Sequence, residues 1–136
     1  MPPITEQEMI LTRTSTQPLE TVCARLPEVS QQHKFGVLGT HNLKEKMAAK
    51  GVAFDRECRV FEVCNPHQAK EVLSRSMRVS TALPCRISVW EEDGKTVLAT
   101  LKPTALLTIF DIAGAEGTAQ QVEDTLVRIM EETAAG

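Results

Sequence analysis

The chain has 136 residues, of which 42% are hydrophobic and 24% charged, and its 15 basic and 18 acidic side chains give a formal net charge of -3. This length predicts a single domain over residues 1–136, which can bury about two thirds of its unfolded surface without a disulfide or a structural metal. The apolar fraction excludes a disordered chain. The near-balanced charge argues against binding to nucleic acid or anionic membranes, because both depend on dense Lys and Arg.

The amino-terminal segment and the cysteines bear on the compartment. Residues 1–9, MPPITEQEM, show neither the basic start nor the apolar core of a secretory signal. The longest apolar-rich stretch, residues 105–115, is too short to cross a membrane. We therefore expect a cytoplasmic protein without membrane insertion, in which cysteines stay free thiols. The cysteines are Cys23, Cys58, Cys64 and Cys85.

Hydrophobic periodicity predicts two strands and two helices in the first part of the chain. Alternation over residues 8–14 predicts a strand. Pro18, followed by apolar residues at helical spacing, predicts a helix in which Pro27 introduces a kink or a break. A short strand over 36–41 and a short helix over 43–50 are expected next.

The segment CRVFEVC, residues 58–64, is the clearest strand in the sequence. Asn65 follows it as a helix N-cap, and the fixed φ of Pro66 suits the first helical turn. Gln68 is placed to complete a capping box by returning a hydrogen bond to the N-cap residue. We expect this helix to extend to about residue 77, with Met77 among its buried residues.

Residues 85–91 and 95–101 predict two more strands, joined by an Asp-Gly turn that is typical of an antiparallel hairpin. A last helix is expected to begin near Thr118, with Gln121 completing a capping box, and residues 103–116 carry no decisive pattern. These elements predict an α+β fold, a mostly antiparallel sheet of four to five strands with helices packed on one face. The other face is then open to water or to a second subunit.

Three segments carry a resemblance to a known family: GVLGTHNLKEKMAAKGVAF, CRVFEVCNPHQAKEVL and ALPCRISVWEEDGKTVLATLKPTALL. In this order and spacing they resemble domain-of-unknown-function family 302, over residues of about 22–133. The shared features include a CNP turn that opens a helix and an LPC strand that leads into a hairpin. The resemblance implies a small α+β fold and a homodimer, without a settled activity. His41 departs from the pattern, because the family tends to carry an acidic residue there.

The CNP turn and the LPC strand supply the candidate ligand-binding residues. Cys64 stands directly before a helix N-terminus, whose free amides and dipole are expected to lower the pKa of its thiol. The resemblance implies that the LPC strand lies next to the CNP turn, which brings Cys85 close to Cys64. We expect a small-molecule pocket there. Its expected lining is Cys64, Asn65, Pro66, His67, Cys85 and Arg86.

Two other functions compete with a ligand pocket. His41, Cys64 and His67 are candidate ligands of a transition metal or a haem iron, with Cys85 or Met77 as further ligands. Structural zinc is not expected, because no second CxxC or HxxxH pair supplies four ligands. Alternatively, Cys64 is the nucleophile of a thiol redox protein and Cys85 resolves its disulfide. The simplest interpretation is that the cysteines only pack in the interior and that His67 is exposed and binds no metal.

The sequence contains no GxSxG, P-loop, GxGxxG or HExxH motif, so we favour binding over an enzymatic function. Alternation along residues 85–91 places Arg86 and Trp90 on the same side of their strand. Trp and Arg are enriched at protein interfaces, which favours a subunit contact on this side.

Overall fold

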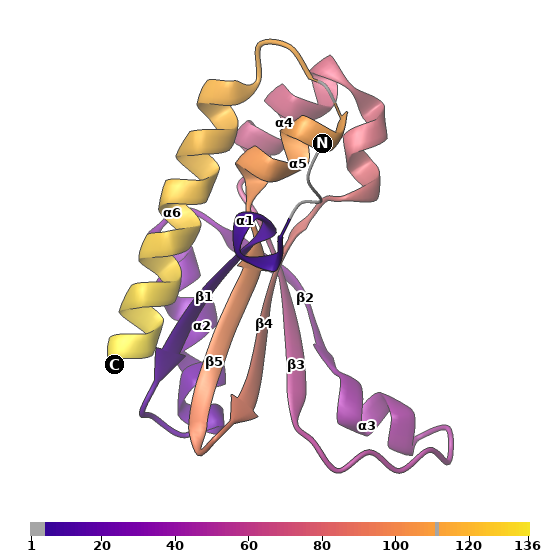
Figure 1. Cartoon of the computed structure of the whole chain (residues 1–136), viewed down its shortest axis with the longest axis vertical. Helices are drawn as coiled ribbons and strands as arrows, with labels where there is room; N and C mark the ends of the chain where they lie inside the picture. The colour runs from indigo at the N-terminus through magenta and orange to yellow at the C-terminus, as the bar shows by residue number, and fades with distance from the viewer. Residues whose placement is uncertain (1–4, 111) are drawn as a thin grey trace.

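The computed structural model describes residues 5–110 and 112–136, and its centre is a five-stranded antiparallel sheet (Figure 1). The spatial order of the strands is β1-β5-β4-β3-β2, and all neighbouring strands are antiparallel. The predicted α+β class and antiparallel sheet are therefore confirmed. The strands are β1 (Ile10–Ser15), β2 (Gly36–Asn42), β3 (Cys58–Cys64), β4 (Cys85–Glu92) and β5 (Lys95–Leu101).

The helices form two groups around this sheet. The two longest, α2 and α6, cover one face, and Figure 1 shows α2 behind the strands. A second group, which we call the helical cap, consists of α4, η1, α5 and the first turns of α6, and it lies beyond the end of the sheet where β3 ends and β4 begins (Figure 1). Among the described residues, no helix combines the length and the apolar character needed to cross a membrane. The helices are α1 (Glu6–Met9), α2 (Leu19–Gln32), α3 (Leu43–Ala48), α4 (Pro66–Arg75), the 3-10 helix η1 (Met77–Thr81), α5 (Pro103–Phe110) and α6 (Glu116–Ala135).

The main core lies between the covered face of the sheet and helices α2 and α6. Leu26 of α2 and Leu126 and Ile129 of α6 are fully buried in it. The sheet contributes alternate residues of its central strands, as expected when one face of a sheet packs on helices. These are Phe61, Val63, Ile87, Val89 and Leu98.

The opposite side of the sheet, which we call the open face, carries the intervening residues. The pairing register places Trp90 opposite Cys58 of β3 and opposite Val97 of β5. Arg86 lies on the same side, opposite Glu62. The prediction that Arg86 and Trp90 share one side of their strand is therefore confirmed.

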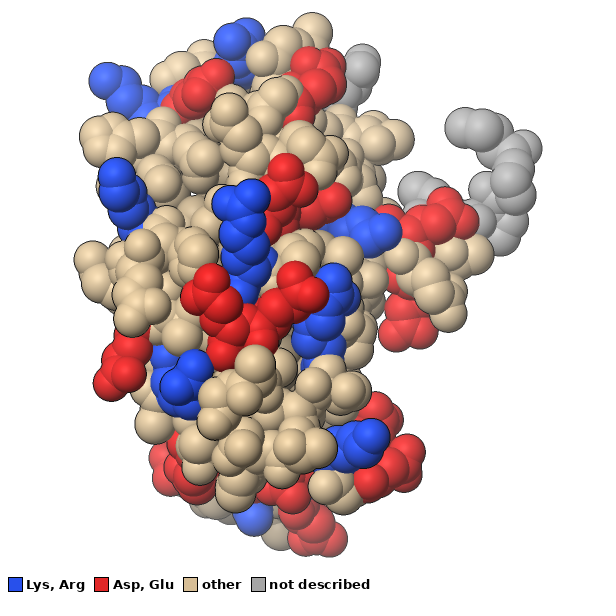
Figure 2. Space-filling view, turned by 90° about the vertical axis from the view of Figure 1, so that its left-hand side faces the viewer, with Lys and Arg blue, Asp and Glu red and all other residues tan. Residues whose placement is uncertain are grey.

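The charged side chains of the outer surface are mixed in sign. Figure 2 shows the side of the molecule that lies on the left in Figure 1, where Lys and Arg alternate with Asp and Glu. Surface ion pairs include Arg13 with Glu131 at 3.7 Å and His33 with Glu132 at 3.0 Å. On the visible face the charges thus follow the near balance of the composition.

Two local turn predictions are confirmed. Asp93 and Gly94 have φ angles of 51° and 77°, the positive values that a two-residue type I′ hairpin requires. The side-chain oxygen of Asn65 accepts hydrogen bonds from the backbone N–H groups of His67 at 3.0 Å and Gln68 at 3.2 Å. Asn65 is therefore the N-cap of α4, and Pro66 opens its first turn.

Other boundaries differ from the predictions because of packing. The first strand begins only at Ile10, since the short helix α1 precedes it. Of the predicted kink or break at Pro27, the break is excluded, because α2 continues through this residue. Its neighbours Leu26 and Val29 are 0% and 5% exposed in the main core, and this burial stabilises the helix on both sides of the proline.

Two helix ends in the second half also differ from the predictions. Helix α4 ends at Arg75, because Ser76 adopts an extended conformation, and the next turn is the 3-10 helix η1. Met77 is therefore 72% exposed instead of buried. Helix α6 begins at Glu116 without a side-chain cap, so the capping box predicted with Gln121 is wrong. Helix α5 occupies most of the segment that carried no decisive pattern.

Candidate functional site

A cavity of about 60 Å³ lies where the sheet meets the helical cap. Its walls come from strands β3 and β4 and from helices α4, η1, α5 and α6. Apart from Asn65, Gln68 and two cysteines, the described lining residues are apolar, and none of them is charged. They include Val63, Val72, Leu83, Leu107, Phe110 and Ile112. The arrangement is that of a small apolar binding cavity.

The CNP turn and the LPC strand meet at this cavity. Cys64, Asn65 and Cys85 all line it. The antiparallel register places Cys85 directly opposite Val63, so that Cys85 and Cys64 are neighbours across two strands. The structure thus brings together three of the six residues expected to bind a ligand.

The other three expected residues lie elsewhere. Pro66 and His67 are exposed on the first turn of α4 and do not line the cavity. Arg86 lies on the open face, with a side chain that is 59% exposed and an Nε atom 3.8 Å from Oε2 of Glu62. These residues therefore do not contact the cavity in this structure.

The two thiols at the cavity keep their protons at neutral pH. Burial raises the pKa of Cys85 to about 11, and the nearby Cys64 adds to the increase. Desolvation also raises the pKa of Cys64. The lowered pKa that we predicted for Cys64 is therefore wrong, because burial of the thiol disfavours its charged form. All four cysteines are free.

Gln68, one of the lining residues of the cavity, does not form the predicted capping box. Its backbone N–H donates to Asn65, but its side chain does not return a hydrogen bond. Instead, Oε1 of Gln68 is buried and has no hydrogen-bond partner among the described residues. A buried acceptor without a partner costs about 1–3 kcal/mol. We did not predict this property, because the only signal in the sequence was a Gln at a capping-box position.

His41, the first of the predicted metal ligands, lies on β2 and belongs to a polar cluster beside the open face. Its Nε2 is 2.8 Å from Oε1 of Glu62, and its Nδ1 is 2.5 Å from Nζ of Lys46. The hydrogen bond with His41 lowers the pKa of Glu62, and the charges of His41, Arg86 and Lys46 act in the same direction. Gly39 makes room for this contact, because a Cβ atom there would lie 2.9 Å from Oε1 of Glu62.

The predicted metal ligands are not brought together. His41 contacts Glu62 and Lys46, Cys64 lines the cavity, and His67 is exposed on α4. Over residues 5–110 and 112–136, no group of three His, Cys, Asp or Glu side chains could hold a metal ion.

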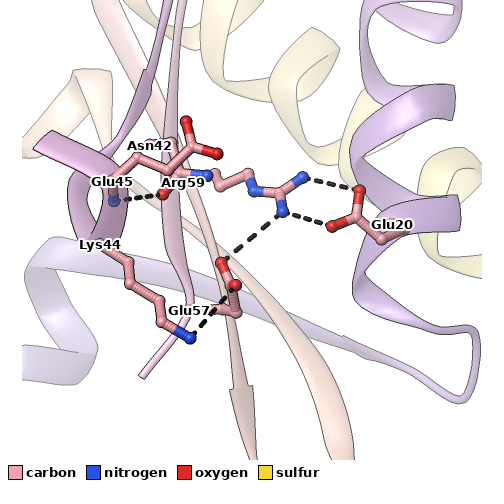
Figure 3. Close-up of polar contacts among 6 residues, drawn as sticks. All are labelled: Glu20, Asn42, Lys44, Glu45, Glu57 and Arg59. Atoms are coloured by element: carbon pink, nitrogen blue, oxygen red, sulfur yellow. Dashed lines mark hydrogen bonds and ion pairs between the residues drawn. The ribbon is translucent and has the colours of Figure 1, made fainter. Parts of the chain in front are cut away.

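A second polar cluster, drawn in Figure 3, joins α2, α3 and β3. The guanidinium of Arg59 donates two hydrogen bonds to the carboxylate of Glu20, one of them at 2.9 Å. It also lies 3.6 Å from Glu57, which in turn lies 3.7 Å from Nζ of Lys44. The hydrogen bonds with Arg59 lower the pKa of Glu20. This group links helix α2 to the sheet and does not line the cavity.

Comparison with known proteins places the chain in a family. A family model described as a domain of unknown function, DUF302, matches residues 11–133. The chain is also similar to the crystal structure of an uncharacterized conserved protein DUF302 from Bacillus stearothermophilus, with 30% identity and a TM-score of 0.85 over 91% of this chain and 97% of that chain. No curated protein gives a match. The chain therefore belongs to the DUF302 family of domains of unknown function.

Proposed function

We propose that this protein binds a small, uncharged, apolar molecule in the cavity between the CNP turn, the LPC strand and the helical cap. The observation that carries the proposal is the lining, which is apolar except for two carboxamides and two protonated thiols. Transfer of apolar surface from water into such a lining is favourable by about 25 cal/mol per Å². The compartment we propose is the reducing cytoplasm, where the free thiols stay reduced.

The cavity limits the size and the affinity of this ligand. An apolar cavity of about 150 Å³ is known to bind benzene. A cavity of about 60 Å³ holds a smaller molecule, or one part of a larger molecule. Since small ligands gain at most about 1.5 kcal/mol per non-hydrogen atom, a five-membered ring binds no more tightly than a few micromolar, and we expect millimolar dissociation constants.

Furan, an uncharged five-membered ring, is a suitable probe. Titration with millimolar furan is expected to shift the amide NMR signals of residues around the cavity, and the shifts should saturate. Ala69→Phe, which fills the cavity from α4, is expected to abolish the saturable shifts because it occupies the same space. Ala24→Phe, at an exposed position on α2, is the matched control and should bind as the wild type does. Shifts that do not saturate, or that persist in Ala69→Phe, contradict the proposal.

We also propose a homodimer in which a second copy covers the open face. Trp90 stands on β4, the central strand of the sheet, between Cys58 and Val97, on the face opposite to α2 and α6. Arg86 and Glu92 are exposed on the same side of β4, towards opposite ends of the strand. A two-fold axis that crosses the strand between them places Arg86 opposite Glu92 of the partner subunit, so the face is complementary to itself in charge.

The dimer predicts a mass of twice 15.0 kDa in light scattering at micromolar concentration. Trp90→Glu is expected to give a monomer, because it removes the central aromatic contact and introduces a charge that the interface cannot solvate. Met77→Glu, at a position on η1 that is 72% exposed, should leave the mass unchanged. A wild-type monomer at this concentration would rule the dimer out.

A further inference from the structure

We infer that the ligand is an elongated molecule whose apolar end fills the cavity and whose uncharged polar end lies in a second space, the outer cleft, between α5 and α6. This inference rests on the proposed ligand cavity and specifies its ligand class, an uncharged amphiphile such as an alcohol with an apolar chain or ring. The observation behind it is that the cavity and the outer cleft share two lining residues, Leu107 and Ile112.

The outer cleft is larger and more polar than the cavity. Its volume is about 400 Å³, against about 60 Å³ for the cavity. Each helix contributes two polar residues spaced four positions apart, the spacing of one helix face, and these are Thr104 and Thr108 of α5 and Glu116 and Gln120 of α6. Thr104 also ties the two helices together, because its N–H and its hydroxyl donate to Oε1 of Glu123 at 3.2 and 2.6 Å. Thr108, Glu116 and Gln120 are exposed, so a bound molecule can reach the polar side of the cleft.

The two spaces adjoin at Leu107 and Ile112. Ile112 is 6% exposed and belongs to the apolar cluster of the helical cap, whereas Leu107 is only partly buried against that cluster. Leu107 is therefore the side chain that moves when a ligand extends from one space into the other. The cavity alone holds no more than a small ring, so the rest of a longer molecule passes this boundary and lies in the outer cleft.

The charges around the outer cleft disfavour an anionic ligand. Glu116 places a carboxylate in the lining, and none of the described lining residues is Lys or Arg. The guanidinium of Arg75 packs against Gly114, next to Ala113 of the lining, but Arg75 does not itself line the cleft. A hydroxyl or amide group at the polar end of the ligand finds hydrogen-bonding side chains there without repulsion from Glu116.

3-(2-Furyl)propan-1-ol tests this inference, because it carries the furan ring on a chain of three methylenes that ends in a hydroxyl group. We expect it to bind wild-type protein at least about tenfold more tightly than furan, since each methylene that leaves water tightens binding about fourfold. Its saturable amide NMR shifts should include Thr108 and Gln120, which furan leaves unshifted. 3-(2-Furyl)propanoate, which ends in a carboxylate instead, should bind about two- to fivefold more weakly than the alcohol.

Two substitutions on α5 locate the chain of the alcohol. Thr108→Trp, which fills the outer cleft, should remove the advantage of the alcohol over furan and leave furan binding as in the wild type. Ile109→Trp is the matched control, because Ile109 is the next residue of α5, is 57% exposed and does not line the cleft. This control should keep the full advantage of the alcohol.

Each outcome of these titrations decides the inference. Equal binding of furan and the alcohol to wild-type protein overturns it and leaves the apolar cavity proposal standing. An advantage without shifts at Thr108 and Gln120, or one that survives in Thr108→Trp, also overturns it, because the chain then lies outside the cleft. A propanoate that binds as tightly as the alcohol contradicts the uncharged ligand class. If neither furan nor the alcohol gives saturable shifts in wild-type protein, both the cavity proposal and this inference fail.

Discussion

Ile129→Ala is expected to lower the free energy of unfolding by about 2–5 kcal/mol. Ile129 lies on α6 in the main core and is 0% exposed, so truncation leaves a cavity between α6, α2 and the sheet that the surrounding side chains fill only in part. A domain of this size has about 5–15 kcal/mol of stability in total, so the loss is a large fraction of it. Urea unfolding followed by circular dichroism measures the change.

Ile109→Ala provides the control with the same chemical change. Ile109 is on α5 and is 57% exposed, so its truncation removes little buried surface. We expect a change within about 0.5 kcal/mol, because alanine also has the higher helix propensity. Equal losses for the two variants would contradict the packing of α6 described above.

Arg59→Met is expected to lower the free energy of unfolding by about 1–2 kcal/mol at pH 7, the contribution of hydrogen bonds between charged groups at a partly exposed site. The Arg59 side chain is 16% exposed, and methionine keeps its apolar stem while it removes the guanidinium. The change breaks the link from β3 to Glu20 on α2 and leaves Glu57 with Lys44 alone. The measurement is again urea unfolding, repeated between pH 7 and pH 3.

The destabilisation caused by Arg59→Met should decrease in acid. The hydrogen bonds with Arg59 lower the pKa of Glu20 in the folded protein. A carboxyl group whose pKa is lower when folded contributes stability above its unfolded pKa, near 4.5, and that contribution is lost as the pH falls through the folded value. The free energies of unfolding of the wild type and of Arg59→Met should therefore converge below about pH 4.

Arg13→Met is the control for this pair of measurements. Arg13 and Glu131 are 36% and 56% exposed and 3.7 Å apart, and exposed ion pairs contribute little to stability. We expect Arg13→Met to change the free energy of unfolding only slightly, and by a similar amount at pH 7 and pH 3. If the effect of Arg59→Met does not change between pH 7 and pH 3, its contacts with the two carboxylates are not what stabilises the fold.

The features that could be predicted from the sequence depend on interactions between close neighbours. Asn65 caps α4 through hydrogen bonds to residues two and three positions ahead. Asp93 and Gly94 form their turn through their own φ preferences, and Pro66 starts a helix for the same reason. Strand β3 was predicted from its run of strand-forming residues, and the family resemblance indicated that the CNP turn meets the LPC strand.

The errors arose where distant residues decide the outcome. Burial of Leu26 and Val29 in the main core holds α2 together at Pro27, which local propensity alone disfavours. Met77 is exposed because α4 ends at Arg75, about two residues before the predicted end, where Ser76 becomes extended. For Cys64, the helix dipole was visible in the sequence, but its pKa depends on how much water the folded chain excludes.

By itself, the sequence determined the α+β class, the antiparallel hairpin, the free cysteines and the family, because periodicity, turn residues and short motifs act over a few positions. Only the tertiary structure decided which residues form the cavity, since its walls come from segments as far apart in the chain as Phe35 and Val122. It also decided that the oxygen of Gln68 is buried without a partner, while Arg86 and His41 lie away from the cavity. Solvent exclusion and contact between distant segments exist only after the chain has folded, and they set both the lining and the charge state of the site.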